Sequence, residues 1–144
     1  EDGIRDVAVT GVQTCAIPIC ISAGAQTALL VGDIEAAQES RLVRAWQGTG
    51  HLHADVLLVP HHGSKTSSTP EFLDAVQPRW ALVQSGYRNR FGHPAPPVVA
   101  RYAAARINLV DSPHCGAMRW RSDEPQKVAC QRELDRRYWH HDVP

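Results

Sequence analysis

The stretch DVLLVPHHGSKTSS at residues 55–68 decides the fold, because it joins an apolar run directly to a polar loop. The run at residues 55–60 predicts a buried strand, and the proline at its end stops the strand. Two histidines, a glycine, a lysine and several hydroxyl residues follow without a spacer. Polar residues directly after a buried strand are typical of sites at the carboxyl ends of the strands in an α/β sheet.

The segments on both sides of this stretch alternate between strand and helix patterns. Apolar runs predict further strands over residues 27–31, 80–84, 107–110 and 117–121. Amphipathic spacing, a Ser68 or Thr69 cap and the pair Pro96-Pro97 predict helices over residues 34–46, 69–76 and 96–105. Residues 127–141 have a mixed period and predict no element. The alternation indicates an α/β fold with helices covering a sheet.

Composition sets the class of protein. The chain has 144 residues, of which 43% are apolar and 21% charged, so it fits a single packed domain. Its formal net charge is zero, but residues 1–77 hold four basic against nine acidic residues, and residues 78–144 hold eleven against six. The basic second half favours an anionic partner. The sequence shows no apolar run of transmembrane length and no secretory signal pattern.

The four cysteines give no metal-binding or disulfide pattern. Cys15, Cys20, Cys115 and Cys130 form no C-x-x-C pair and no repeated spacing. A zinc ribbon is therefore disfavoured, and a disulfide framework is not indicated in a chain of this size.

The first nineteen residues differ from the rest. Residues 2–19 have neither helical nor strand periodicity and closely resemble translated sequencing-adaptor sequence. We therefore expect residues 1–19 to be a non-native leader and residues 20–144 to be the domain. The alternative interpretation is a disordered native N-terminus.

Asp33 is the first candidate site residue. It follows the predicted strand at residues 27–31, where a carboxylate is well placed for a metal or another ligand. A lone Gly-Asp pair is more often a helix cap, so this residue alone favours the cap.

The second candidate is the His61-His62 pair with the loop after it. Neutral imidazole is a strong ligand for divalent transition metals. Adjacent side chains of an extended chain point to opposite faces, so one histidine is expected to bind a given metal and the other to face substrate or a supporting partner. Ser64 and Lys65 begin a polar run that leads into a helix N-terminus, which favours an anion such as phosphate. The alternative is a polar turn with exposed histidines.

The third candidate is the loop at residues 89–94. His93 is held there by glycine and proline, with Arg88, Asn89 and Arg90 beside it. Such a histidine is a ligand or a general acid, or simply a turn residue. The pattern at residues 51–55, with His51 and His53, imitates half of an H-x-H-x-D-H metal motif. It runs straight into a strand, so we expect both histidines to be exposed loop residues.

A resemblance adds to this interpretation. The segments LLVGDIE, ADVLLVPHHGSKTSS, LVQSGYRNRFGHP and DSPHCGAMRW occur in this order at residues 29–35, 54–68, 82–94 and 111–120. Together they resemble the carboxy-terminal metallo-β-lactamase-fold domain of the bacterial late-competence DNA-internalisation family (ComEC-type), over about residues 20–140. The resemblance implies the C-terminal part of a four-layer αββα sandwich within the α/β class.

The resemblance also implies roles for the candidate residues. It implies two divalent metal ions, Zn or Mn, with Asp33 as a bridging ligand and His62, in preference to His61, as a histidine ligand. His61 and His93 would be catalytic, and DNA would be held by Ser64, Lys65, Arg88, Asn89 and Arg90. The family's proteins lie in the bacterial inner membrane, with this domain as a soluble part and the membrane-embedded channel domain of the same chain as its partner.

The resemblance predicts a metal-dependent phosphodiesterase, or nuclease, that acts on DNA during uptake. The family's early H-x-H-x-D-H-type ligand motif does not occur in this sequence, so we expect this fragment alone to retain no metal pair and to be inactive. Two alternatives stay open. One is a hydrolase of the same fold that acts on a small phosphoester or thioester, and the other is a degenerate DNA-binding module without catalysis.

Overall fold

The computed structural model describes residues 3–6, 18–138 and 143. Its strands and helices follow one another as β1 (Gly3–Asp6), β2 (Ile19–Ala23), β3 (Gln26–Leu30), α1 (Ala36–Trp46), β4 (Val56–Leu58), a 3₁₀ turn (Pro60–Gly63), α2 (Pro70–Val76), β5 (Trp80–Val83), α3 (Pro96–Ala104), β6 (Asn108–Asp111), α4 (Ser112–Cys115), β7 (Met118–Trp120), β8 (Val128–Cys130) and α5 (Gln131–Leu134).

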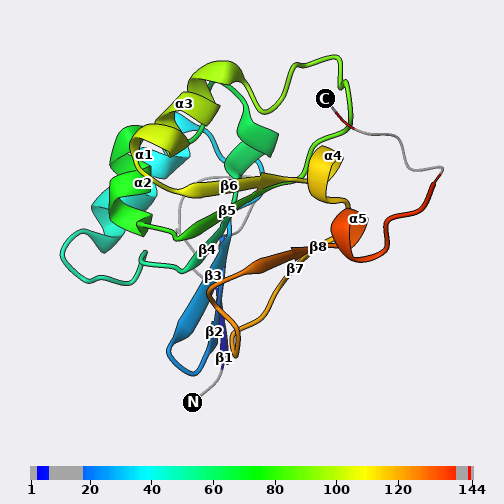
Figure 1. Ribbon diagram of the computed structural model, residues 1–144. Coiled ribbons are helices and arrows are strands. Elements are labelled where there is room, and N and C mark those ends of the chain that lie inside the picture. Colours follow the sequence, from blue (N-terminus) through cyan, green and yellow to red (C-terminus); the bar gives the residue numbers. More distant parts are fainter. Residues whose placement is uncertain (1–2, 7–17, 139–142, 144) are drawn as a thin grey trace.

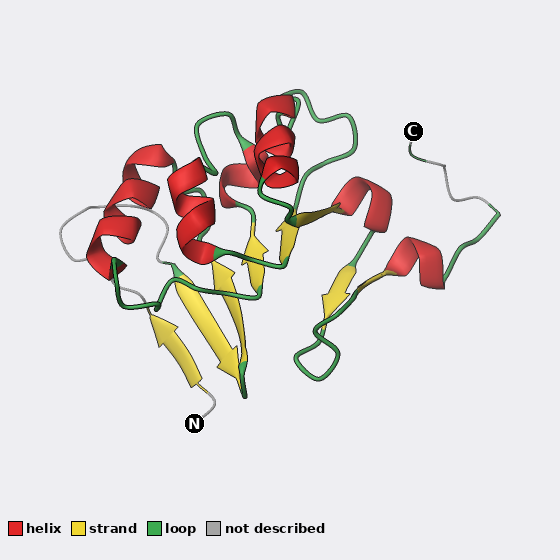
Figure 2. Cartoon of the chain, turned by 60° about the vertical axis from the view of Figure 1, so that its left-hand side comes forward, coloured by secondary structure: helices red, strands yellow, loops and turns green. Residues whose placement is uncertain are grey.

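The main sheet has six strands in the order β1-β2-β3-β4-β5-β6. The pairs β1–β2 and β2–β3 are antiparallel, and β3 to β6 are parallel. Helices α1, α2 and α3 connect the parallel strands and lie on the same side of the sheet (Figures 1 and 2). A sheet of sequential parallel strands whose crossovers share one hand places its helices in this way. The α/β prediction is confirmed.

The core lies between this face of the sheet and the three helices. Leu29, Leu57 and Ala81 are aligned across the parallel strands and are almost fully buried. Helix residues of the same cluster pack against them: Leu42, Phe72, Leu73, Val76, Val98 and Tyr102. Burying large apolar side chains in such a cluster is the main stabilising contribution in a domain of this size.

The opposite face of the sheet is apolar but only half-buried. Leu30, Leu58 and Leu82 are aligned on it. The separate β7–β8 hairpin lies against part of this face, where the indole of Trp80 donates to the Pro125 carbonyl at 3.1 Å. Parallel strands are normally covered on both faces, so this aliphatic row is a surface suited to further packing.

The predicted elements match the observed ones within a few residues, apart from both ends. The sequence interpretation missed β2 and the hairpin that joins it to β3, in which Gly24 has a positive φ of 59°. It also gave no element to residues 3–6, which form the strand at the end of the sheet. Ile19, the last residue of the expected leader, belongs to β2. The division between a leader and a domain stays a prediction, because residues 7–17 lie outside the described part.

The expectation about the cysteines was wrong. Cys115 and Cys130 form a disulfide bond that joins α4 to the end of β8, and Cys20 is a buried free thiol. The two cysteines are fifteen positions apart in the sequence, and the β7–β8 hairpin folds back and brings the two sulfurs together. None of the helices in the described part of the chain is both long and apolar enough to cross a bilayer.

Candidate metal and nucleic-acid site

The candidate residues meet at the carboxyl ends of three adjacent parallel strands. Asp33 follows β3, His61 and His62 follow β4, and His93 lies in the loop between β5 and α3. Residues far apart in sequence are brought together because neighbouring parallel strands end at the same edge. We call this edge, with its loops, the strand-end site.

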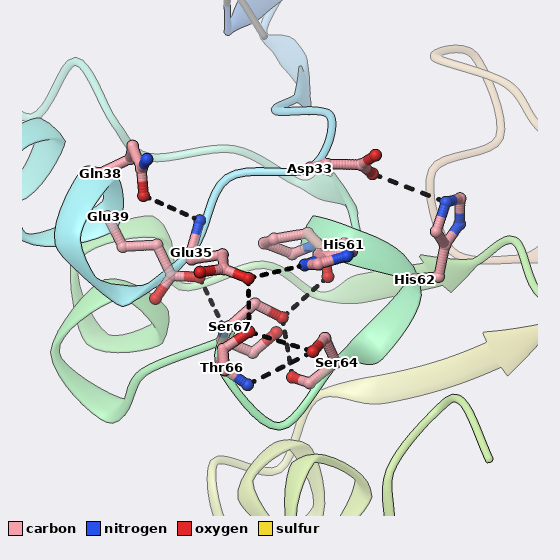
Figure 3. Close-up of polar contacts among 11 residues, drawn as sticks. Asp33, Glu35, Gln38, Glu39, His61, His62, Ser64, Thr66 and Ser67 are labelled. Atoms are coloured by element: carbon pink, nitrogen blue, oxygen red, sulfur yellow. Dashed lines mark hydrogen bonds and ion pairs between the residues drawn. The ribbon is translucent and has the colours of Figure 1, made fainter. Parts of the chain in front are cut away.

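Asp33 and His62 face each other across this site (Figure 3). The Oδ1 atom of Asp33 lies 3.5 Å from Nε2 of His62, and both side chains are more than half exposed. The other ring nitrogen of His62, Nδ1, lies 2.7 Å from the Gln84 carbonyl oxygen. A carbonyl can only accept, so Nδ1 holds the proton of the neutral ring and Nε2 is left with its lone pair toward Asp33.

Asp33 is not the cap of α1. The N-cap is Glu35, which forms a capping box in which its backbone N–H donates to Oε1 of Gln38 at 3.2 Å. This removes the structural role that most often explains an aspartate after a strand. The Asp33 carboxylate is therefore positioned toward the site, where its Oδ1 atom lies 3.5 Å from Nε2 of His62.

The two histidines lie in a left-handed turn. His61 has φ 47° and ψ 43°, and His62 has φ 55° and ψ 18°. The expectation of an extended chain was wrong, although the two rings still point in different directions (Figure 3). For a residue other than glycine, this backbone conformation costs about 1–2 kcal/mol of conformational free energy. Strain of this kind is concentrated at functional sites.

His61 connects the strand-end site to α1 and to His93. Its Nδ1 lies 3.2 Å from Oε1 of Glu35, although the contact lacks hydrogen-bond geometry and leaves this buried nitrogen without a bonded partner. Its ring centroid is 6.1 Å from that of His93. Partial burial lowers the pKa of His93, and the nearby His61 and His62 lower it further. His93 is therefore neutral at pH 7, the form that binds metals and accepts protons.

The hydroxyl loop after the histidines is folded on itself. Ser64 is buried, and its hydroxyl lies 3.0 Å from the Thr66 hydroxyl. The Thr66 hydroxyl in turn donates to the Glu35 carboxylate at 2.8 Å. The Ser67 hydroxyl donates to the carbonyls of Pro60 and Ser64. These bonds, visible in Figure 3, fix the loop against α1. The hydroxyl of Ser64 thus already has a partner within the protein.

A buried carboxylate, Glu39, occupies the position expected for an anion. Its two oxygens accept from the backbone N–H groups of Ser68 at 2.5 Å and Thr69 at 2.8 Å. Burial raises the pKa of Glu39, and those N–H groups and Arg101 offset the effect only in part. The expected phosphate position before α2 is therefore filled by the protein's own side chain.

Arg101 and Tyr102 of α3 complete this buried network. Arg101 donates to the carbonyls of Ser67 and Ser68, and the hydroxyl of Tyr102 lies 3.0 Å from that of Ser68. The sequence interpretation assigned no role to these two residues or to Glu39. Its spacing was the available signal, because Glu39 lies three and four residues before Leu42 and Val43 on the apolar face.

Close contact of two loops holds His93 in place. Gly63 has φ 82°, and a Cβ atom there would lie 2.7 Å from the Cβ of Pro94. The N–H of Ala95 donates to the Gly63 carbonyl at 2.8 Å. The Asn89 side chain donates to the Gly86 and His93 carbonyls and accepts from the His93 N–H. Both polar ends of Asn89 are therefore used within its own loop.

The remaining basic candidates are exposed, and two of them belong to a loop that lines an open cleft. The cleft has a volume of about 430 Å³, and its lining includes His62, Gln84, Phe91 and His93. Arg88 and Arg90 are exposed on the adjacent loop, and Lys65 is exposed on the loop after the histidines. The prediction for the pattern at residues 51–55 is confirmed, since His51 and His53 are exposed loop residues. Asp55 instead accepts from the Thr27 N–H at 2.7 Å, which joins β3 to β4.

The ligand set is incomplete for a two-metal centre. Two ligands of one tetrahedral zinc ion lie roughly 3.3 Å apart, so the Asp33–His62 spacing fits two positions of a coordination shell. Within the described residues, no group of three or more His, Cys, Asp or Glu side chains could hold a metal ion. The described residues therefore offer Asp33 and His62 as two possible ligands and no complete set.

The comparisons relate the chain to a segment of longer bacterial proteins, two of which have competence names. It is 38% identical over 100 residues to competence protein ComA of Neisseria gonorrhoeae, a match that covers 69% of this chain. It is 32% identical over 98 residues to ComE operon protein 3 of Bacillus subtilis, covering 68% of the chain. It is 39% identical over 83 residues to recombination protein 2 of Haemophilus influenzae, covering 58%.

These matches are confined to a small part of the relatives. The chain spans 14%, 12% and 10% of the lengths of the three proteins. No protein-family model matches the chain. The similarity thus supports the competence part of the expected relationship, at the level of one segment.

Proposed function

We propose that this chain is a segment of a competence protein and contributes to a metal-dependent phosphodiesterase site that acts on DNA during uptake. The observation on which the proposal depends is the Asp33–His62 pair at the carboxyl ends of β3 and β4. The similarity to proteins named for competence supports the biological context.

Asp33 and His62 would be two of the metal ligands. The Gln84 carbonyl fixes the His62 ring with Nε2 toward Asp33, which is the arrangement that supporting contacts give to a metal-binding histidine. Because the relatives are seven or more times longer than the matched segment, the remaining ligands would come from other parts of such a protein. When bound, the metals would supply a hydroxide nucleophile and polarise the phosphodiester.

The other histidines would act beside the metals. His93 is neutral, lines the cleft and lies next to His61, so it is positioned to exchange a proton with a substrate or leaving group. Glu35 lies near His61 and would orient that ring. Lys65, Arg88 and Arg90 would hold the phosphate backbone through charge. Ser64 and Asn89 would keep the two loops in shape, given the bonds that they already make.

The same proposal includes the fold and the location. The half-buried row of Leu30, Leu58 and Leu82 would be covered by a second layer, giving the αββα sandwich of the metallo-β-lactamase fold. The domain would be the soluble part of a protein of the bacterial inner membrane and would work beside its channel domain.

The test compares this chain alone with a chimera in which it replaces the matched segment of Neisseria gonorrhoeae ComA. Labelled DNA is incubated with each protein and excess Mn²⁺ or Zn²⁺. We expect no cleavage by the chain alone, because two ligands cannot hold the catalytic metals. We expect cleavage by the chimera, reduced about a hundredfold or more by Asp33→Asn or His62→Ala and unchanged by the control His53→Ala.

Two results would contradict the proposal. Cleavage by the chain alone that is lost in Asp33→Asn would mean that the ligand count is wrong. Cleavage by the chimera that neither the Asp33 nor the His62 variant reduces would remove both residues from the site.

A further inference from the structure

The loop between β5 and α3 presents two exposed aromatic rings next to the strand-end site. The exposed fraction of Phe91 is 67% and that of Tyr87 is 41%. Large aromatic side chains usually contribute to a core, and these two lie outside the cluster that forms it. Phe91 also lines the cleft together with His62 and His93.

Each ring has an arginine over it. The Cζ atom of Arg88 is 5.2 Å from the Tyr87 ring centroid, and that of Arg90 is 4.7 Å from the Phe91 centroid. Among the described residues, neither guanidinium takes part in a salt bridge, and the loop at residues 86–94 contains no acidic residue. The loop therefore combines two flat apolar surfaces with two positive charges that no carboxylate neutralises.

Contacts within the protein hold this loop against the histidine turn. Asn89 bonds to both sides of the loop, and the Phe91 ring stacks on His93 with centroids 5.8 Å apart and planes at 29°. Pro94 rests against Gly63 of the histidine turn. A platform that is already ordered loses little conformational entropy on binding.

We propose that Tyr87 and Phe91, with Arg88 and Arg90, form a stacking platform for unpaired nucleobases, so that single-stranded DNA is the form held at this site. The inference rests on the proposed function and specifies its substrate. Every base has a flat π-face that can stack on an aromatic ring, whereas in a duplex those faces are covered by neighbouring base pairs. The Arg90 side chain is exposed, so a base can replace it over the Phe91 ring while its charge moves to a phosphate.

The experiment measures binding by the 144-residue chain in EDTA, where metal-dependent cleavage cannot interfere. The probes are fluorescently labelled: a single-stranded oligothymidylate of twenty nucleotides, an abasic oligomer of the same length and charge, and a DNA duplex of the same length. We expect oligothymidylate to bind about tenfold more tightly than the abasic oligomer, since one stacked base contributes a factor of this size or more. Phe91→Ala and Tyr87→Ala should each remove much of that difference and leave binding of the abasic oligomer unchanged.

Matched variants separate stacking from charge and from folding. Phe91→Trp should keep the preference for oligothymidylate over the abasic oligomer. Arg88→Ala and Arg90→Ala should each weaken the binding of both oligomers and reduce the salt dependence of that binding. His51→Ala removes an exposed ring before β4, at the other end of the strand from the site, and should change nothing.

Equal binding of oligothymidylate and the abasic oligomer would overturn the platform, as would tighter binding of the duplex or no binding of any probe. The proposed function is judged separately by cleavage in the chimera. If the chain shows no preference for oligothymidylate over the abasic oligomer but the chimera still cleaves DNA in a way that depends on Asp33, only the platform is rejected.

Discussion

The carboxylate of Asp33 and the imidazole of His62 come from the ends of neighbouring parallel strands and point toward each other, with 3.5 Å between Oδ1 and Nε2. Two relationships make this contact informative. Glu35, and not Asp33, caps helix α1. The His62 ring is held through its other nitrogen, Nδ1, by the Gln84 carbonyl. Neither residue is needed in this position for the packing of the core, since both are exposed.

The first prediction concerns the tautomer of His62. Long-range ¹H–¹⁵N spectra of the chain should show neutral His62 protonated on Nδ1, because that atom lies 2.7 Å from a carbonyl that can only accept. Adding Zn²⁺ should shift Nε2 of His62, and the shift should be much smaller in Asp33→Asn. His51 serves as the exposed reference. Protonation on Nε2 would contradict the assignment of His62 as a ligand through that atom.

The second prediction concerns the buried carboxylate of Glu39. Glu39→Gln replaces one acceptor by an NH₂ group that faces a backbone N–H, so we expect a loss of about 1–3 kcal/mol in the free energy of unfolding. The exposed Glu71→Gln is the matched control and should change it by less than about 0.5 kcal/mol. Urea denaturation of the three proteins gives the comparison, and equal stability of all three would contradict the role of Glu39.

Glu39 also predicts a pH dependence. Burial raises its pKa above the usual 4.5, so the folded state binds this proton more tightly than the unfolded state. The contribution of Glu39 to stability therefore falls as pH rises from about 4.5 through the raised pKa, and it is constant above that. Urea denaturation across this range should show the decline in the wild type and a flatter profile in Glu39→Gln.

A third prediction follows from the contact between Gly63 and Pro94. Gly63→Ala adds a Cβ atom 2.7 Å from that of Pro94 and also places alanine at a positive φ. Gly48→Ala is the matched control, because its φ is 75° and nothing lies within 4 Å of the added atom. We expect about 1 kcal/mol of destabilisation for Gly48→Ala and clearly more for Gly63→Ala, measured by urea denaturation. Equal losses would mean that Pro94 moves aside freely.

The fourth prediction concerns the disulfide. Breaking the Cys115–Cys130 bond by Cys115→Ser should lower the free energy of unfolding by about 2–3 kcal/mol, because the cross-link closes a loop of fifteen residues in the unfolded chain. Adding a reductant to the wild type should have the same effect. Cys20 is buried and free, so reductant should cause no further loss in Cys115→Ser. Unfolding that is insensitive to reductant would contradict the pairing.

The central part of the fold could be predicted because local signals and tertiary structure agree there. Thr69 caps α2 through the Phe72 N–H, with Pro70 in the first turn, as the sequence indicated. Asp33, His61, His62 and His93 could be placed together because each follows or flanks a strand of one parallel sheet. The rule that strand ends form sites needs only the order of elements.

The remaining features depend on contacts that no local pattern encodes. The Cys115–Cys130 pair requires the β7–β8 hairpin to fold back, and the spacing of the cysteines alone does not show this. The anion position before α2 is filled by Glu39 from a different helix. The left-handed turn at His61 and His62 could not be foreseen either, because nonglycine residues rarely adopt it without support from their surroundings.

The sequential order of β3, β4, β5 and β6 has a consequence for how the molecule is made. Each strand pairs with the one synthesised just before it, so the parallel part of the sheet can grow in step with translation, one strand–helix unit at a time. The ribosome would release Asp33 first, then the histidine turn and finally the loop of Phe91. Each newly added strand would use its predecessor as a template, and the site would be assembled from its β3 side toward its β5 side.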